Sequence, residues 1–307
     1  MLIFAHPGFA GHATPDLHPE NAARLLAVER GLEGLSFGRR TCPVADEALV
    51  LRGHPGAYLD RLRKAVPDRG HVALDADTVL SPGSLEAALR AVGGACAAVE
   101  AVLAGEARRA FVACRPPGHH AERATAMGFC LLGTVALAAL HALEGCGLAR
   151  VAVVDFDVHH GNGTQDLLLD EGRALFASSH QMPLYPGTGR ADETGAHGQV
   201  VNVPLAPGGD GAAMRRAYER TILPRVEAFA PDLILLSAGF DAHRDDPLGG
   251  LRWTAEDYAW LTARLCALAD RVCGGRVVSC LEGGYDPAAL AASVAAHVGE
   301  LQGRADG

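Results

Sequence analysis

The chain has 307 residues, of which 27 are basic and 36 are acidic, so its formal net charge is −9. Hydrophobic residues make up 49% of the sequence, which argues against intrinsic disorder, and the negative charge argues against nucleic-acid binding through bulk electrostatics. A chain of about 300 residues can bury roughly three quarters of its unfolded surface, so one large core is feasible.

The first residues and the cysteines indicate the compartment. Residues 1–4 lack the charged and apolar regions of a secretion signal, and no apolar run is long enough for a membrane span. The 8 cysteines include no C-x-x-C pair. We therefore expect a cytoplasmic protein in which Cys96, Cys146 and Cys266 are reduced and buried.

Short apolar runs with many β-branched residues are predicted to be strands. They are continuous rather than alternating, which is typical of strands that are buried on both faces of a parallel sheet. In chain order they span residues 2–5, 110–114, 150–155, 174–178, 199–203, 233–237 and 276–280.

Helical patterns fill the gaps between these runs. Apolar residues recur every three or four positions from Ser84 to Leu103. Residues 254–257 resemble a capping box, and Asp286-Pro287 supplies an N-cap and a proline for the first helical turn. The alternation of strand and helix predicts a single doubly wound α/β domain over residues 1–302, followed by a tail of residues 303–307.

Polar clusters follow several of the predicted strands. Open parallel sheets bind their ligands at the carboxyl ends of the strands. We therefore expect these clusters to converge on one edge of the sheet. They comprise residues 115–120, 155–163, 238–241 and 282–285.

Asp157, His159 and Asp241 form a candidate metal site. Asp157 and His159 are two residues apart, so on an extended segment they point the same way, and Asp241 joins them from another strand end. One imidazole and two carboxylates leave an open coordination position, which is typical of a catalytic Zn²⁺ site. Because the set contains no thiolate, Fe²⁺, Mn²⁺ and Co²⁺ are alternative metals for this site.

The adjacent His119 and His120 are candidates for proton transfer. A hydrolytic metal site needs a base for the water proton and an acid for the leaving amine, and a histidine pair can provide both. Asp155 and Asn162 are available partners. Asp155 would raise the basicity of one imidazole, whereas Asn162 would orient the other without adding charge.

Tyr285 and two further aromatic residues complete the candidate site. Gly283 and Gly284 allow close backbone approach to a substrate, and the phenol of Tyr285 could donate a hydrogen bond to a developing oxyanion. Phe129 and Tyr185 could form the walls of a slot for an aliphatic chain.

Together these segments resemble the metal-dependent histone deacetylase family. The matching stretches are RPPGHHAE at 115–122, AMGFC at 126–130, DFDVHHGNGTQ at 155–165, YPGTG at 185–189, SAGFD at 237–241 and LEGGY at 281–285. Their order and spacing match from about His6 to the end of the chain. Asn162, where class I members carry Asp, is similar to the class II branch and its bacterial histone deacetylase-like amidohydrolases.

The resemblance implies a fold and its bound ions. It implies a histone deacetylase-like catalytic domain over residues 1–302 with the arginase/deacetylase α/β fold, whose central, mostly parallel sheet has about eight strands flanked by helices. It implies Zn²⁺ at Asp157, His159 and Asp241. It also implies a structural K⁺, and less securely a second one. The positions that match the first K⁺ site are Asp155, Asp157, His159, Ser178 and Ser179.

The resemblance also implies roles for individual residues. His120 would be the general base, supported by Asn162, and His119 would be its electrostatic or acid partner, paired with Asp155. Tyr285 would polarise the amide carbonyl. The substrate-binding positions would be Gly128, Phe129, Tyr185, Leu248 and Gly284. The chain departs from the family at Leu131-Leu132-Gly133, which puts the packing behind Phe129 in question.

These observations predict a zinc-dependent amidohydrolase that deacylates acyl-lysine side chains in peptides or proteins, or similar small N-acyl amines. One alternative is an acetylpolyamine or other small-molecule deacylase. Leu248 stands where polyamine-selective relatives carry an acidic residue, which disfavours this alternative. Two further alternatives are a silent acetyl-lysine binding module and an arginase-like enzyme with two metals. We expect no nucleic-acid or membrane partner, and an oligomer stays possible.

Overall fold

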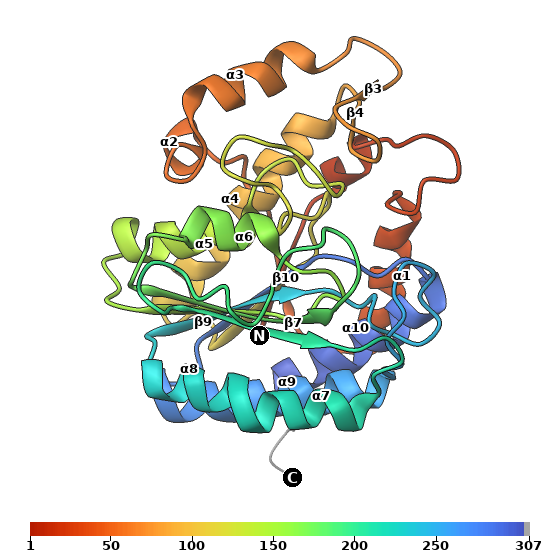
Figure 1. Ribbon diagram of the computed structural model, residues 1–307. Coiled ribbons are helices and arrows are strands. Elements are labelled where there is room, and N and C mark those ends of the chain that lie inside the picture. Colours follow the sequence, from red (N-terminus) through yellow and green to blue (C-terminus); the bar gives the residue numbers. More distant parts are fainter. Residues whose placement is uncertain (304–307) are drawn as a thin grey trace.

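The fold is built on one parallel sheet, seen near the middle of Figure 1. The computed structural model describes residues 1–303; the rest of the predicted tail, residues 304–307, lies outside the described residues. The sheet has eight strands in the order β2-β1-β5-β10-β9-β6-β7-β8, and every neighbouring pair is parallel. The strands are β1 (Leu2–Ala5), β2 (Gly38–Thr41), β5 (Arg109–Val112), β6 (Val151–Asp155), β7 (Ala174–Gln181), β8 (Val200–Leu205), β9 (Leu233–Ala238) and β10 (Val277–Leu281).

The continuous apolar runs form strands, as predicted: six lie inside the sheet, and the run at 199–203 forms the edge strand β8. All residues of β6 and β9 are buried, because helices cover both faces of the sheet. The sequence-based prediction missed β2, in which every residue is exposed. An edge strand needs no apolar face, and charged side chains such as Arg39 and Arg40 discourage pairing with other chains.

Helices form a layer on each side of the sheet (Figure 1). One layer contains α4 (Ser84–Leu103), α5 (Thr134–Leu140) and α6 (Asn162–Leu168). The opposite layer contains α7 (Gly211–Ala217), α8 (Leu223–Phe229), α9 (Ala255–Val272) and α10 (Pro287–Gln302), with α1 (Ala23–Leu32) packed against α10. The smaller elements are α2 (Glu47–Val50), α3 (Gly56–Ala65) and the hairpin of β3 (Val72–Ala73) and β4 (Val79–Leu80).

The predicted helix signals are confirmed. The bounds of α4 are those that the apolar spacing predicts. At the start of α9, the backbone N–H of Thr254 donates to the Asp257 carboxylate at 3.0 Å, as a capping box requires. At the start of α10, the Asp286 carboxylate accepts from the backbone N–H groups of Ala288 and Ala289. These side chains satisfy backbone donors that the first helical turn leaves without a partner.

The cysteines are all free thiols. Cys96 and Cys266 are buried, as predicted, whereas the prediction for Cys146 was wrong because this residue is only partly buried. It caps the end of a short helical segment, His141–Gly145, where the chain turns towards β6. Within residues 1–303, none of the helices combines the length and the apolarity that a bilayer crossing needs.

The sheet order explains how the polar clusters meet. The strands that precede them, β5, β10, β9 and β6, are consecutive neighbours in the sheet. Because all of them are parallel, the four segments that follow them leave the same edge of the sheet side by side.

Candidate active site

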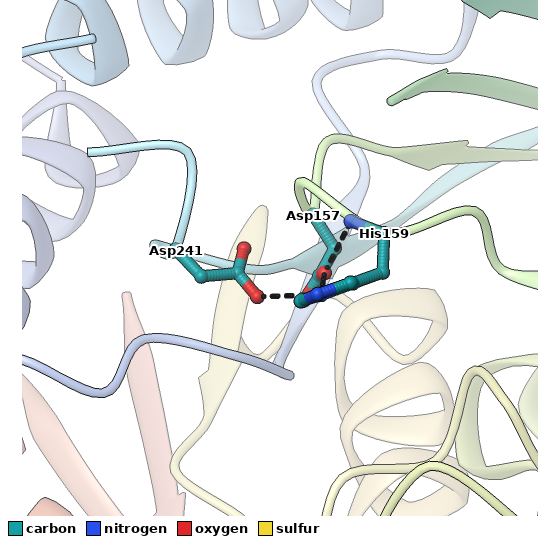
Figure 2. Close-up of side chains that lie close together, drawn as sticks. All are labelled: Asp157, His159 and Asp241. Carbon is teal, nitrogen blue, oxygen red and sulfur yellow. Dashed lines mark hydrogen bonds and ion pairs between the residues drawn. The ribbon is translucent and has the colours of Figure 1, made fainter. Parts of the chain in front are cut away.

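Asp157, His159 and Asp241 lie together where the segments after β6 and β9 meet (Figure 2). All three residues are buried, and one potential ligand atom from each lies within 4.8 Å of the others. The Nδ1 atom of His159 is 3.1 Å from Oδ1 of Asp157 and 3.1 Å from Oδ2 of Asp241.

Backbone donors orient both carboxylates. The N–H of Val158 donates to Oδ1 of Asp241 at 2.8 Å, and the N–H of Gly283 donates to Oδ2 of Asp157 at 2.9 Å. Gly283 has to be a glycine, because a Cβ atom there would lie 2.1 Å from Oδ2 of Asp241. The buried, oriented donor set of one nitrogen and two carboxylates fits a divalent cation such as Zn²⁺.

The histidine pair lies beside these residues, and its two imidazoles have different partners. Nδ1 of His119 is 3.0 Å from Oδ2 of Asp155, whereas Nδ1 of His120 is 2.7 Å from Oδ1 of Asn162. The two ring centroids are 4.0 Å apart. The structure therefore brings together the four residues that the sequence analysis grouped as a proton-transfer unit.

The surroundings of the two imidazoles shift their pKa values in opposite directions. Burial disfavours the charged form of His119, but the carboxylates of Asp157 and Asp155 outweigh burial and hold the pKa of His119 well above its ordinary value. Burial, with the positive charge of His119 beside it, holds the pKa of His120 well below its ordinary value. His120 is therefore the better proton acceptor at neutral pH, because it is the neutral imidazole.

A cavity of about 250 Å³ leads to this cluster. His120 and His159 line it together with the aromatic side chains of Phe129, Tyr185 and Tyr285. Burial raises the pKa of the Tyr285 phenol well above its ordinary value, so this group is a hydrogen-bond donor at neutral pH. The remaining lining residues are Asp77, Gly128, Leu184 and Leu248.

Gly128 stands in close contact with His120. Its φ of +55° is in the left-handed region, and a Cβ atom there would lie 2.4 Å from Cδ2 of the His120 ring. Gly284, the other glycine that we predicted to bind substrate, is not among the described residues that line the cavity. Its carbonyl oxygen instead accepts a hydrogen bond from Nε of Arg24 at 2.7 Å.

The residues that match a monovalent-cation site are also close together. Ser178 lies opposite Asp155 in the β6–β7 pairing. The hydroxyl of Ser178 contacts Nδ1 of His180 at 2.9 Å, and that of Ser179 contacts the hydroxyl of Tyr218 at 3.0 Å. Asp155 and Ser178 are therefore neighbours across the two strands, as a shared cation site requires.

Leu131 and Leu132, where the chain departs from the family pattern, are both buried in the core. The Leu131 carbonyl accepts a hydrogen bond from the Tyr58 hydroxyl at 2.6 Å. The segment behind Phe129 is therefore well packed despite the unusual residues.

Sequence reasoning missed several buried charged residues around the cluster. Glu20 and Arg24 precede and begin α1, and both are buried. Glu282 is also buried; it belongs to the segment that carries Tyr285, and its carboxylate contacts the segment that carries His119. Their positions in the sequence give no sign of burial, although Glu282 belongs to the matching stretch LEGGY.

Residues 18–301 match the model of the Histone deacetylase domain. The chain belongs to the histone deacetylase family. This confirms the resemblance and makes the protein a hydrolase that acts on amides. The family is generally metal-dependent, and the buried Asp157, His159 and Asp241 are residues that could hold the metal ion.

Two curated relatives of this histone deacetylase family protein illustrate the match. A protein from Pseudomonas aeruginosa named histone deacetylase-like amidohydrolase is 41% identical over 97% of the chain and 78% of its own length. A protein from Archaeoglobus fulgidus named probable deacetylase is 39% identical over 92% of the chain and 80% of its own length. Bacterial and archaeal members therefore share nearly the whole of this domain.

A solved structure confirms the fold of this family member. The match to the crystal structure of the HDA15 HD domain covers 99% of the present chain and 91% of the chain in that crystal structure, with a TM-score of 0.92 and 32% sequence identity. The predicted arginase/deacetylase fold, one parallel eight-stranded sheet between helices, is therefore correct.

Proposed function

We propose that this deacetylase is a zinc-dependent enzyme that removes acyl groups, most simply acetyl, from lysine side chains or similar amines. The observation that carries the proposal is the cavity that joins His120 and His159 to aromatic walls. Its volume of about 250 Å³ and its apolar lining suit an extended aliphatic chain that presents one amide at the buried end.

The chain's own residues would divide the proton transfers. His120, neutral and oriented by Asn162, takes a proton from the attacking water. The phenol of Tyr285 donates a hydrogen bond to the amide carbonyl oxygen as negative charge develops on it. An imidazolium of the histidine pair then returns a proton to the leaving amine.

Zn²⁺ bound by Asp157, His159 and Asp241 would supply a Lewis acid and lower the pKa of a water molecule to around 7. Gly128 would contribute its backbone carbonyl beside the amide, and Phe129, Tyr185 and Leu248 would contact the aliphatic chain. A structural K⁺ near Asp155 and a cytoplasmic location complete the proposal.

A second candidate substrate class is a small N-acyl amine with a free ammonium group. Asp77 supports it, because this residue places a carboxylate in the wall of the cavity. Leu248 supports the acyl-lysine alternative, because it is an apolar residue in the same wall. We favour acyl-lysine, since Leu248 and the aromatic side chains make most of the cavity wall apolar.

The test compares kcat/KM on acetyl-lysine peptides and on acetylated polyamines, with the wild type and with Asp77→Asn. We expect the peptide to be preferred and this preference to change little in the variant. A preference for polyamines that Asp77→Asn removes would identify the second candidate. Binding of acetyl-lysine without turnover, even with added zinc, would instead identify a silent binding module.

A further inference from the structure

The segment after β5 carries the histidine pair, and the segment after β10 carries Tyr285. A buried carboxylate, that of Glu282, links the two segments. Oε2 of Glu282 accepts hydrogen bonds from the backbone N–H groups of Gly118 at 2.7 Å and His119 at 3.1 Å. Its Oε1 is 3.3 Å from the hydroxyl of Ser237 on β9. The side chain of Glu282 therefore fixes the backbone that carries His119, while its own backbone leads into Tyr285.

Arg24 of α1 holds the same Tyr285 segment from the other side. Its Nε donates to the carbonyl of Gly284 at 2.7 Å, and its Nη2 donates to the carbonyl of Glu282. The guanidinium carbon lies 5.0 Å from the centre of the Tyr285 ring. Arg24 thus contacts the backbone on the N-terminal side of Tyr285 and the ring itself.

Glu20 connects Arg24 to the segment that carries the histidine pair. Its Oε1 accepts from Nη1 of Arg24 at 3.1 Å and from Nε of Arg115 at 2.6 Å. Its Oε2 accepts from Nη2 of Arg115 at 2.8 Å and lies 3.3 Å from Nε2 of His12. Arg115 begins the stretch that leads to His119 and His120, and both Glu20 and Arg115 are 0% exposed.

These contacts form a closed ring. It runs from Glu20 through Arg24 to the backbone of residues 282–284, then through the Glu282 carboxylate to residues 118–119, and returns through Arg115 to Glu20. We propose that Glu20 and Glu282 are positioning residues that fix the distance between the histidine pair and Tyr285.

The chemistry at the site makes this distance important. Water attack and carbonyl polarisation occur on one amide, so His120 and Tyr285 must be placed correctly at the same time. Misplacement by about 1 Å costs roughly a hundredfold in rate. A buried ion pair is also weak evidence for stability alone, because apolar residues of similar volume often replace such pairs without loss. This inference rests on the proposed function, in which Tyr285 contacts the substrate carbonyl.

A double-mutant cycle tests the proposal in the zinc-loaded full chain. Glu20→Gln, Glu282→Gln and Tyr285→Phe are measured singly, and each Gln variant is then combined with Tyr285→Phe. Each Gln variant alone should lower kcat by about tenfold to a hundredfold with little change in KM. In the Tyr285→Phe background, each should lower kcat much less, because the distance between the histidine pair and the phenol no longer affects the rate.

Asp270→Asn is the control, at an ion pair far from the candidate site. The Asp270 carboxylate accepts from Nη2 of the buried Arg109 at 3.0 and 2.9 Å. Arg109 is the first residue of β5, so this pair lies at the amino ends of the strands, whereas the candidate site lies at their carboxyl ends. This variant should lower the melting temperature without changing kcat. If Glu20→Gln does not fold, Glu282→Gln decides the outcome.

Two results would overturn the inference while leaving the proposed function intact. The first is an unchanged kcat in the Gln variants. The second is a double variant whose fold-loss in kcat equals the product of the fold-losses of the Gln variant and of Tyr285→Phe. An unchanged kcat in Tyr285→Phe itself would instead contradict the oxyanion role on which the inference rests.

Discussion

Nδ1 of His120 lies 2.7 Å from the side-chain oxygen of Asn162. A neutral amide orients the imidazole without adding negative charge, whereas the neighbouring His119 has a carboxylate partner. This contrast lets two adjacent histidines differ in proton affinity, and it can be tested by changing the charge at residue 162.

Asn162→Asp should move the acidic limb of the kcat/KM pH profile upwards. A general base works only above its pKa, and a carboxylate next to His120 raises that pKa. The expected shift is about one pH unit, at the lower end of the range for a close opposite charge. The profile is measured on an acetyl-lysine substrate.

Glu122 has to be controlled in this experiment, because its Oε1 accepts from Nδ2 of Asn162 at 2.9 Å. Glu122→Gln is therefore measured alone and combined with Asn162→Asp. The same upward shift in the Glu122→Gln background attributes the effect to His120. An acidic limb that does not move would contradict the base assignment.

Gly128→Ala should reduce activity at least tenfold. The added methyl group would lie 2.4 Å from the His120 ring at a φ of +55°. Gly105→Ala has similar backbone strain at a φ of +76°, with nothing within 4 Å of the added atom, so it is the control. Both variants should lose roughly 1 kcal/mol of stability from strain. Equal activities would show that the contact with His120 does not matter.

Leu248→Glu should shift specificity towards acetylpolyamines. Leu248 lines the cavity, so a carboxylate there would attract a distal ammonium group. An attraction of about 1 kcal/mol raises kcat/KM for the polyamine, relative to an acetyl-lysine peptide, by about fivefold. The conservative control is Leu248→Gln, which should change this ratio little. A ratio that rises equally in both variants would argue against a charge effect.

Glu20 should contribute stability that depends on pH. Burial alone would raise its pKa, but the positive charge of Arg115 holds the pKa of Glu20 well below the ordinary value of 4.5. A lowered pKa gives stability that is fully present above pH 4.5 and is lost as the pH falls through the folded-state value.

Urea unfolding of Glu20→Gln measures this contribution. The variant should lose about 3–5 kcal/mol at neutral pH, because Arg115 loses its partner, and the difference from wild type should shrink in acid. Glu106→Gln breaks an exposed pair with Arg40 and should change stability by less than about 1 kcal/mol. A Glu20→Gln difference that stays constant down to pH 3 would contradict the linkage.

The sequence predicts the interior of the sheet and the cluster at its edge well, because both depend on short-range patterns. Continuous apolar runs identify β6 and β9, and the spacing of Asp157 and His159 is enough to mark them as candidate ligands. Asp241 is far away in sequence, but the carboxyl ends of parallel strands share one edge of the sheet, so its convergence is predictable too.

The burial of the charged residues next to the cluster could not be predicted from the sequence. Glu20 and Arg24 are four residues apart, just before and within α1, and in a sequence this spacing usually indicates an exposed helical ion pair. Only the tertiary structure shows that both are buried and that Arg24 reaches the backbone of Gly284. The edge strand β2 was missed for the related reason that exposed residues carry no apolar signal.

The most direct test of the central claim is the metal content of the purified chain, measured together with hydrolysis of an acetyl-lysine peptide. We predict one divalent ion per chain, loss of activity in proportion to metal removal by a chelator, and recovery when Zn²⁺ is added back. Asp241→Ala should lose both the bound metal and the activity. Full turnover by the metal-free protein, or by Asp241→Ala, would contradict the account.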